Sequence, residues 1–161
     1  MKKNDRALIV HVDSVPLEGC SLTGEVSPGS LDLPTEGRGV FKTPVTFDLF
    51  LSLVEGKLLA QGKVETRFEG YCDRCLEPFD QPLAIDDVCW FFEDVDNETI
   101  DLTESLREDI LLHFPQRLLC DSGCLGLCPL CGRALVDGVC DCETVDCGES
   151  PWSALDGFDT H

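Results

Sequence analysis

The 161-residue chain is long enough for one domain, or for one domain with a small metal-binding module, and its 43% hydrophobic residues can form a modest core. Its formal net charge of −19 argues against binding to naked nucleic acid, because phosphate binding depends on Lys and Arg side chains. No segment reaches the roughly 18 apolar residues of a membrane span, and the apolar run after the basic N-terminus is too short for a signal peptide, so a cytoplasmic protein is expected.

The first half of the chain predicts an antiparallel β body. Ala7–Val12 is a short β-branched run that predicts a strand, and a second strand is expected near Ser21–Val26. Apolar residues alternate at period two from Val45 to Leu53, and a further extended pattern runs from Leu58 to Tyr71. The turn residues Glu55-Gly56 lie between these segments, so the pattern predicts one long hairpin.

Residues 81–92 predict a third long strand, and the spacing of its apolar residues slips near Asp86-Asp87, where we expect a β-bulge. An acidic loop follows, and after it a helix is predicted. Asp101 would be its N-cap residue and Glu104 the third residue of a capping box. The helix would end before Pro115 and bury one apolar stripe, which consists of Leu102, Leu106, Ile110 and Phe114.

The expected fold class is α+β. A mainly antiparallel β body with one amphipathic helix would occupy residues 1–116, and a cysteine-rich zinc-knuckle region would occupy residues 117–161. Near the end of the chain three apolar residues are expected to form a latch that packs on the metal-binding region, with a docking stripe for a partner as the alternative: Trp152, Leu155 and Phe158.

Eight of the eleven cysteines stand in motif-like positions. Four thiolates that converge from two close pairs are what tetrahedral Zn²⁺ binds in a closed structural site, and such a set is formed by Cys128, Cys131, Cys140 and Cys142. A second zinc site, with ligands from two distant turns, would consist of Cys72, Cys75, Cys120 and Cys124. In a cytoplasmic protein thiols stay reduced, so these cysteines are interpreted as ligands rather than disulfides.

Several alternatives remain at this point. Iron also fits four thiolates, Cys120 or Cys124 could join the downstream set, and Cys147 could substitute into it. Cys20, Cys89 and Cys147 are expected to be spare thiols, with Cys89 as a small hydrophobe in an apolar run, and His113 is a reserve ligand. The sequences around the two Cys-x-x-Cys turns differ too much to predict a repeat.

The layout of these elements resembles the YceD family, also called large ribosomal RNA subunit accumulation proteins. The similar pieces cover about residues 40–155: the first cysteine turn with its flank, Cys72–Phe79; the helix segment, Leu106–Leu112; and the second cysteine block, Cys120–Gly132 with Cys140-Asp141-Cys142. The resemblance implies a role in the accumulation of large-subunit ribosomal RNA, through its processing or through subunit assembly.

We therefore expect a non-enzymatic ribosome-assembly factor. Residues 76–161 carry 3 basic and 20 acidic side chains, a field that attracts basic proteins, although solubility alone could also explain it. The expected partner is a basic large-subunit ribosomal protein or a pre-ribosomal RNA–protein complex. In the near-neutral N-terminal half, Lys57, Lys63 and Arg67 share odd-number parity and could form one basic face that touches RNA.

Two other functions are kept as alternatives. One is a thiol-dependent oxidoreductase that uses Cys72 and Cys75, which requires a reactive cysteine of low pKa. The other is a stand-alone zinc-ribbon module that binds nucleic acid by itself, which requires binding that weakens with salt.

Overall fold

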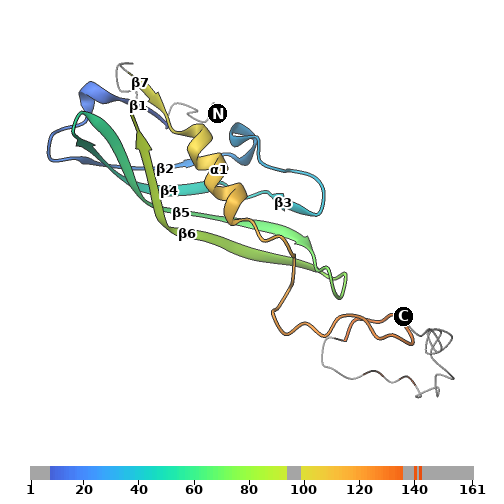
Figure 1. Cartoon of the computed structure of the whole chain (residues 1–161). Coiled ribbons are helices and arrows are strands. Elements are labelled where there is room, and N and C mark those ends of the chain that lie inside the picture. Colours follow the sequence, from blue (N-terminus) through green and yellow to red (C-terminus); the bar gives the residue numbers. More distant parts are fainter. Residues whose placement is uncertain (1–7, 94–98, 136–139, 141, 143–161) are drawn as a thin grey trace, which may run out of the picture.

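The computed structural model describes residues 8–93, 99–135, 140 and 142 (Figure 1). Five antiparallel strands form the main sheet: β2 (Cys20–Val26), β3 (Gly39–Phe41), β4 (Val45–Val54), β5 (Lys57–Tyr71) and β6 (Pro78–Phe92). Strand β5 is central. It pairs with β6 along one edge and with β4 and then β3 along the other, while β2 pairs with β4.

A smaller antiparallel pair joins β1 (Ile9–His11) to β7 (Thr99–Asp101). The helix α1 (Thr103–His113) follows β7, and two short 3₁₀ helices, η1 (Val12–Ser14) and η2 (Pro28–Leu31), lie in the N-terminal part. Figure 1 shows α1 lying across one face of the main sheet. The expected fold class, a mainly antiparallel β body with one helix, is confirmed.

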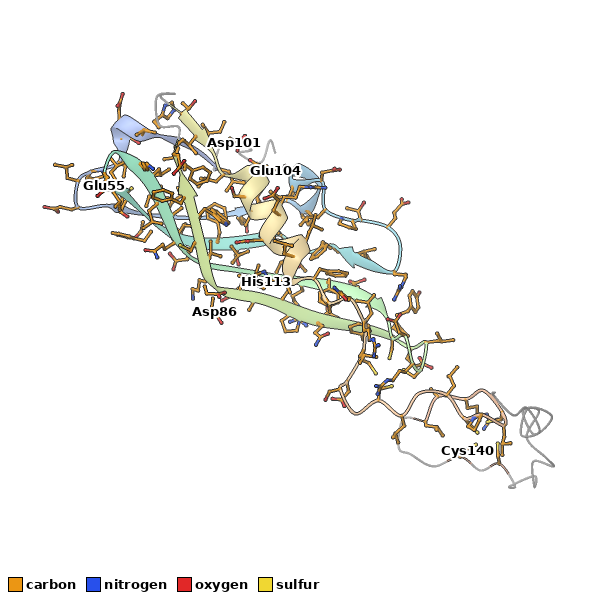
Figure 2. The ribbon with its side chains drawn as sticks, in the orientation of Figure 1. Glu55, Asp86, Asp101, Glu104, His113 and Cys140 are labelled. Carbon is orange, nitrogen blue, oxygen red and sulfur yellow. The ribbon has the colours of Figure 1, made fainter. Side chains whose placement is uncertain are left out.

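The predicted hairpin and bulge are both present. Glu55 and Gly56 have φ values of 53° and 79°, so both residues of the β4–β5 turn are left-handed, as a type I′ turn requires. On β5, Gly62 pairs with Val88 and Val64 pairs with Ile85, so two residues of β6 oppose the single residue between them. Those two residues are Asp86 and Asp87, which confirms the bulge at the position expected (Figure 2).

The inner face of the sheet and the apolar stripe of α1 form the core. Leu102, Leu106 and Ile110 are fully buried, and Trp90 Nε1 on β6 donates to Asp109 Oδ2 on α1 at 2.7 Å. These residues fix α1 on the sheet. The segment that leaves the helix at Phe114 therefore starts beside β3 and β5, where the Phe114 ring contacts those of Phe41 and Phe68.

Two local expectations need correction. Asp101 accepts the Thr103 N–H at 2.9 Å, but the helix begins at Thr103 with Leu102 at the N-cap position, and the Glu104 carboxylate lies 3.5 Å from Arg107 Nη1. The capping box is therefore only half formed. Cys89 was expected to behave as a small hydrophobe in an apolar run, but it is exposed, because its strand neighbours Val88 and Trp90 take the inner face.

Some expectations lie beyond what the structure describes. Cys147, Trp152, Leu155 and Phe158 are outside the described residues, and the boundary at 116/117 stays a prediction. Within the described ranges, no helix combines the length and the apolar character that crossing a membrane would take.

Candidate metal centres

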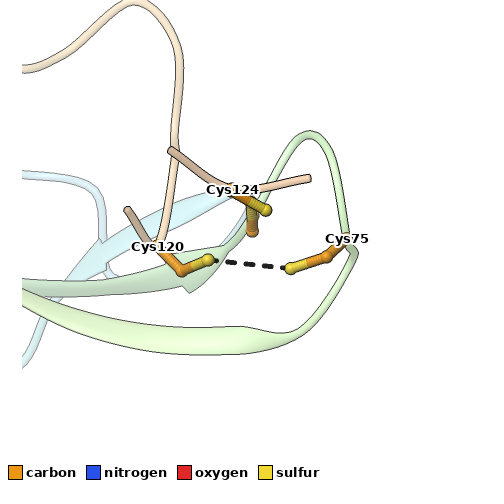
Figure 3. A group of neighbouring side chains, drawn as sticks. Cys75, Cys120 and Cys124 are labelled. Atoms are coloured by element: carbon orange, nitrogen blue, oxygen red, sulfur yellow. Dashed lines mark hydrogen bonds between the residues drawn. The ribbon is translucent and has the colours of Figure 1, made fainter. Parts of the chain in front are cut away.

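The first cysteine cluster joins the β5–β6 turn to the segment after α1. Cys72 and Cys75 lie on the turn, and Cys120 and Cys124 lie on the segment. Figure 3 shows Cys75 facing Cys120, with Cys124 nearby. The four sulfur atoms all lie within 4.8 Å of one another. The Cys72 and Cys124 sulfurs are 3.7 Å apart, and so are the Cys75 and Cys120 sulfurs. Four sulfurs about 2.3 Å from a tetrahedral zinc ion would lie about 3.8 Å from one another, so this cluster fits zinc as it stands.

The second cluster brings together Cys128, Cys131, Cys140 and Cys142, again with all four sulfurs within 4.8 Å. Its sulfurs are closer together than in the first cluster, at 3.4 Å for Cys131–Cys140 and 2.9 Å for Cys140–Cys142. A zinc ion would need the last pair to open by nearly an ångström. Each cluster has one exposed cysteine, Cys120 or Cys131, but the first cluster has two buried cysteines and the second has only Cys128.

The first cysteine of each Cys-x-x-Cys turn makes the same three backbone contacts. The Arg74 N–H and the Leu130 N–H each donate to the preceding cysteine sulfur at 3.4 Å. The Leu76 N–H donates to the Cys72 carbonyl and the Gly132 N–H to the Cys128 carbonyl, both at 2.9 Å. The N–H of each first cysteine in turn donates to the carbonyl five residues later, which is that of Glu77 at 2.9 Å and that of Arg133 at 2.7 Å. The two turns, which looked dissimilar in sequence, therefore share one backbone arrangement.

The shared arrangement needs a left-handed residue directly after the second cysteine. Gly132 fills this position in the second turn with a φ of 71°, as expected for a residue without a Cβ. Leu76 fills it in the first turn with a φ of 63°, although a left-handed conformation costs a residue with a side chain roughly 1–2 kcal/mol. The first turn is therefore held in a strained conformation by the contacts around it.

The N–H groups of each turn favour a thiolate on its first cysteine. Burial raises the pKa of Cys72, but the N–H groups of Cys75, Cys120 and Arg74 outweigh it and lower the pKa to about 6. The N–H groups of Cys131 and Leu130 likewise lower the pKa of Cys128 to about 6. These donors prepare one anionic sulfur in each cluster for a cation.

One further thiol in each cluster has a raised pKa. Burial and the neighbouring thiols raise the pKa of Cys120 to about 12, and hydrogen bonding with Cys140 and then Cys131 raises the pKa of Cys142. A divalent ion would reverse this, because metal-bound thiols are deprotonated, and binding would release protons.

Further contacts anchor the first turn. Arg74 Nη1 donates to the Cys124 carbonyl at 2.8 Å. The Asp73 carboxylate accepts the Leu118 N–H at 2.9 Å and Arg38 Nη2 at 2.5 Å. The Leu118 N–H, and after it Arg38, lower the pKa of Asp73 against the effect of burial, so its carboxylate stays ionised in this position. Sequence reasoning gave no role to Asp73, because its partners lie far away along the chain.

The three cations expected to touch RNA share one face of β5, as their parity predicted, but each lies beside a carboxylate. Lys57 Nζ is 2.9 Å from Glu93 Oε1, Lys63 Nζ is 3.8 Å from Glu65 Oε1, and Arg67 is paired with Asp80. Acidic neighbours thus interrupt the face. His113 bonds through Nδ1 with the Asp109 carbonyl at 2.9 Å and belongs to neither four-cysteine cluster.

Residues 91–159 match a protein-family model described as Large ribosomal RNA subunit accumulation protein YceD. The matched stretch holds α1 and six of the eight clustered cysteines, whereas Cys72, Cys75 and most of the main sheet precede it. Comparisons with curated proteins and with solved structures gave no match. Over residues 91–159, less than half of its length, this chain is therefore similar to the YceD family of large ribosomal RNA subunit accumulation proteins.

Proposed function

We propose that the chain is a non-enzymatic, cytoplasmic factor that supports the accumulation of large-subunit ribosomal RNA, in its processing or in subunit assembly. The match of residues 91–159 to the YceD family supports a role in the accumulation of this RNA. In this proposal the protein acts through a basic large-subunit ribosomal protein or a pre-ribosomal RNA–protein complex. Its net charge of −19 supports a basic partner, since such a field attracts basic proteins and repels free RNA.

The two cysteine clusters would hold structural zinc. Each offers four thiol ligands, which fills a tetrahedral site and leaves no open position for substrate or water. The observation that carries this part of the proposal is the scarcity of other buried residues. Between residues 119 and 135 only Gly126 and Cys128 are buried, so this segment has almost no core of its own. Metal binding would supply the folding free energy that apolar burial does not.

The lowered pKa of Cys72, about 6, meets one requirement of the oxidoreductase alternative, but the burial of this thiol argues against it. A reactive dithiol needs an accessible sulfur, and Cys72 has no exposed surface. Its sulfur also lies 3.7 Å from that of Cys124, in an arrangement that suits a shared cation. The stand-alone nucleic-acid module gains no support, because Lys57, Lys63 and Arg67 are each beside a carboxylate.

The test is replacement of the chain in its own cells by a variant with one ligand of each cluster removed, Cys75→Ser with Cys131→Ser. Mature large-subunit ribosomal RNA is then measured relative to small-subunit RNA. We expect the ratio to fall with the double variant and to stay unchanged with the matched control Cys20→Ser with Cys89→Ser, which leaves both clusters intact. An unchanged ratio with a double variant that holds no metal would overturn the proposal.

A further inference from the structure

The sheet face opposite α1 carries an apolar patch near the β4–β5 turn. Phe50, Val54 and Phe91 are 46%, 43% and 50% exposed. Leu59 is half-buried and lies directly opposite Phe91 on one side and Ser52 on the other. Cross-strand and diagonal neighbours on one face are within reach of aromatic side chains, so these residues form one surface. We call Phe50, Val54, Leu59 and Phe91 the hairpin patch.

Three aspartates lie on the same face as the hairpin patch, further along the strands. Asp48 on β4 is two residues from Phe50 and lies opposite Lys63 of β5. The bulge places Asp86 and Asp87 of β6 opposite the same Lys63, so Lys63 lies between them and Asp48. All three aspartates are exposed, and none has an ion-pair partner among the described residues. In Figure 2, Asp86 lies at the bulge on β6 and Glu55 at the tip of the hairpin.

Among the described residues, two lysines of β5 lie on this surface, and each is already beside a carboxylate. Lys63 Nζ lies 3.8 Å from Glu65 Oε1. Lys57 Nζ lies 5.2 Å from the centre of the Phe91 ring and pairs with Glu93. An approaching group therefore meets aromatic and aliphatic surface next to negative charge. The combination is suited to a ligand that is apolar and cationic at once.

We propose that the hairpin patch, with Asp48, Asp86 and Asp87, is the docking surface for a basic polypeptide segment of a partner protein. Apolar side chains of the segment pack on Phe50 and Phe91, and its Lys or Arg side chains meet the three carboxylates. The inference rests on the basic partner in the proposed function and assigns the surface that receives it. It needs neither cysteine cluster, since no cluster residue lies in the patch.

Charge decides between this occupant and its rivals. A second copy of the chain would bring another net charge of −19 to the same surface, with carboxylates facing carboxylates. Ribonucleic acid would bring phosphates against Asp48, Asp86 and Asp87. A basic segment converts the same charges into attraction and faster encounter, while the aromatic residues provide the anchors that slow its release.

The test uses the full-length, metal-loaded protein and three synthetic peptides of equal length, at physiological ionic strength. One peptide alternates lysine with leucine, one alternates lysine with serine, and one alternates glutamate with leucine. Affinities are measured by fluorescence anisotropy. We expect the lysine–leucine peptide to bind most tightly, because only it satisfies both halves of the surface, and the glutamate–leucine peptide not to bind.

Two variants separate this surface from general acidity. Phe50→Thr with Phe91→Thr keeps strand-forming residues and the charge, and should weaken binding of the lysine–leucine peptide about tenfold or more, since aromatic anchors carry much of an interface's energy. Its control, Ile9→Thr with Leu112→Gln, removes exposed apolar side chains of β1 and α1 and should change nothing.

The second variant removes three charges, Asp48→Asn, Asp86→Asn and Asp87→Asn. Its control removes three exposed charges from other places in the chain, Glu36→Gln, Glu77→Gln and Glu108→Gln. Both have a net charge of −16, so only a local effect can distinguish them. We expect weaker binding of the lysine–leucine peptide to the first alone, by several-fold.

Equal loss in both charge variants, or unchanged binding to the aromatic variant, overturns the inference. So does sedimentation showing a dimer that the aromatic variant dissociates, because the occupant would then be a second copy. These results are independent of the ribosomal RNA ratio. A chain that supports that ratio and binds the peptide regardless of the hairpin patch would retain the proposed function and lose this surface.

Discussion

Asp73 and Leu118 bond to each other twice, although 44 residues separate them in the chain. The Asp73 N–H donates to the Leu118 carbonyl at 2.7 Å, and the Leu118 N–H donates to Asp73 Oδ2 at 2.9 Å. The Leu118 side chain is buried against Gly39 and Gly70, where added Cβ atoms would lie only 3.4 and 3.3 Å from its Cδ1. The chain is thus fastened to the sheet two residues before Cys120, so half of the first cluster is in place without a metal.

The first prediction concerns this fastening. Asp73→Ala removes the carboxylate that accepts the Leu118 N–H, so Cys120 and Cys124 are held less firmly. Outer partners of metal ligands typically contribute about 10- to 100-fold to metal affinity, and we expect a loss of this size at the first cluster. Chelator competition measures it in a Cys131→Ser background, where only the first cluster can bind.

The second turn supplies the control. Pro129 occupies the position that corresponds to Asp73, directly after the first cysteine, and it has no N–H to donate. Pro129→Ala should leave zinc affinity at the first cluster unchanged. If Asp73→Ala also leaves it unchanged, the reciprocal bonds do not position the ligands.

The second prediction concerns stoichiometry. The intact protein should hold two zinc ions, and Cys75→Ser and Cys131→Ser should each hold one, because each removes a ligand from a different cluster. Native mass spectrometry counts the ions. Cys131→Ser should also open residues 125–135 to protease, since this segment has few other buried contacts, while the sheet stays protected.

Cys89→Ser is the matched control, because Cys89 is exposed on β6 and belongs to neither cluster. It should keep two zinc ions and the protease pattern of the parent protein. Full metal content in Cys131→Ser would show that the second group of ligands is assigned wrongly.

The large elements of the fold were predictable because their signals are local. Alternation at period two gave the β4–β5 hairpin, and a break in that alternation placed the bulge at Asp86 and Asp87. The short strand β3 was missed, because Gly39–Phe41 offers too few residues for a period. Its pairing beside β4 along the same edge of β5 depends on tertiary contacts that no local pattern carries.

The cysteine pairs were predictable from spacing, but the likeness of the two turns was not. Their common contacts are made by backbone N–H and carbonyl groups, which any residue type provides. Only the left-handed position can be recognised from residue type, because glycine favours that conformation. The second turn has Gly132 there, but the first turn has Leu76, so its sequence does not indicate a left-handed residue. The bonds between Asp73 and Leu118 were missed for a different reason, since both partners are ordinary in their local sequence.

The third prediction concerns the left-handed residue of the first turn. Leu76 is 62% exposed, so Leu76→Gly loses little apolar burial while it relieves a conformational cost of roughly 1–2 kcal/mol. Glycine also lowers the stability of the folded state by roughly 0.4–1 kcal/mol, because it increases the conformational freedom of the unfolded chain. We therefore expect zinc affinity at the first cluster to stay equal or to rise by up to about tenfold, measured by chelator competition.

The converse change tests the same argument in the second turn. Nothing lies within 4 Å of a Cβ added at Gly132, so Gly132→Ala introduces backbone strain without a clash. Zinc affinity at the second cluster should fall by about tenfold, as a strain of roughly 1–2 kcal/mol implies. A fall in affinity with Leu76→Gly, or none with Gly132→Ala, would contradict the shared geometry.

The fourth prediction concerns the contact that holds α1 on the sheet. Trp90 is only 8% exposed, and its Nε1–H bond to the Asp109 carboxylate, at 2.7 Å, is the polar link between β6 and α1. Trp90→Phe removes the donor and leaves the carboxylate without it, so we expect a loss of about 1.5–3 kcal/mol in the free energy of unfolding, measured with urea. Both zinc ions should remain, because Trp90 contacts neither cluster.

Two further variants are the controls for this bond. Asp109→Asn retains an acceptor oxygen and should lose less stability, whereas Glu108→Gln, on the exposed side of the same helix, should lose none. Equal stability of Trp90→Phe and the parent protein would mean that the apolar stripe of α1 alone fixes the helix, and that the segment carrying Cys120 and Cys124 is positioned without this bond.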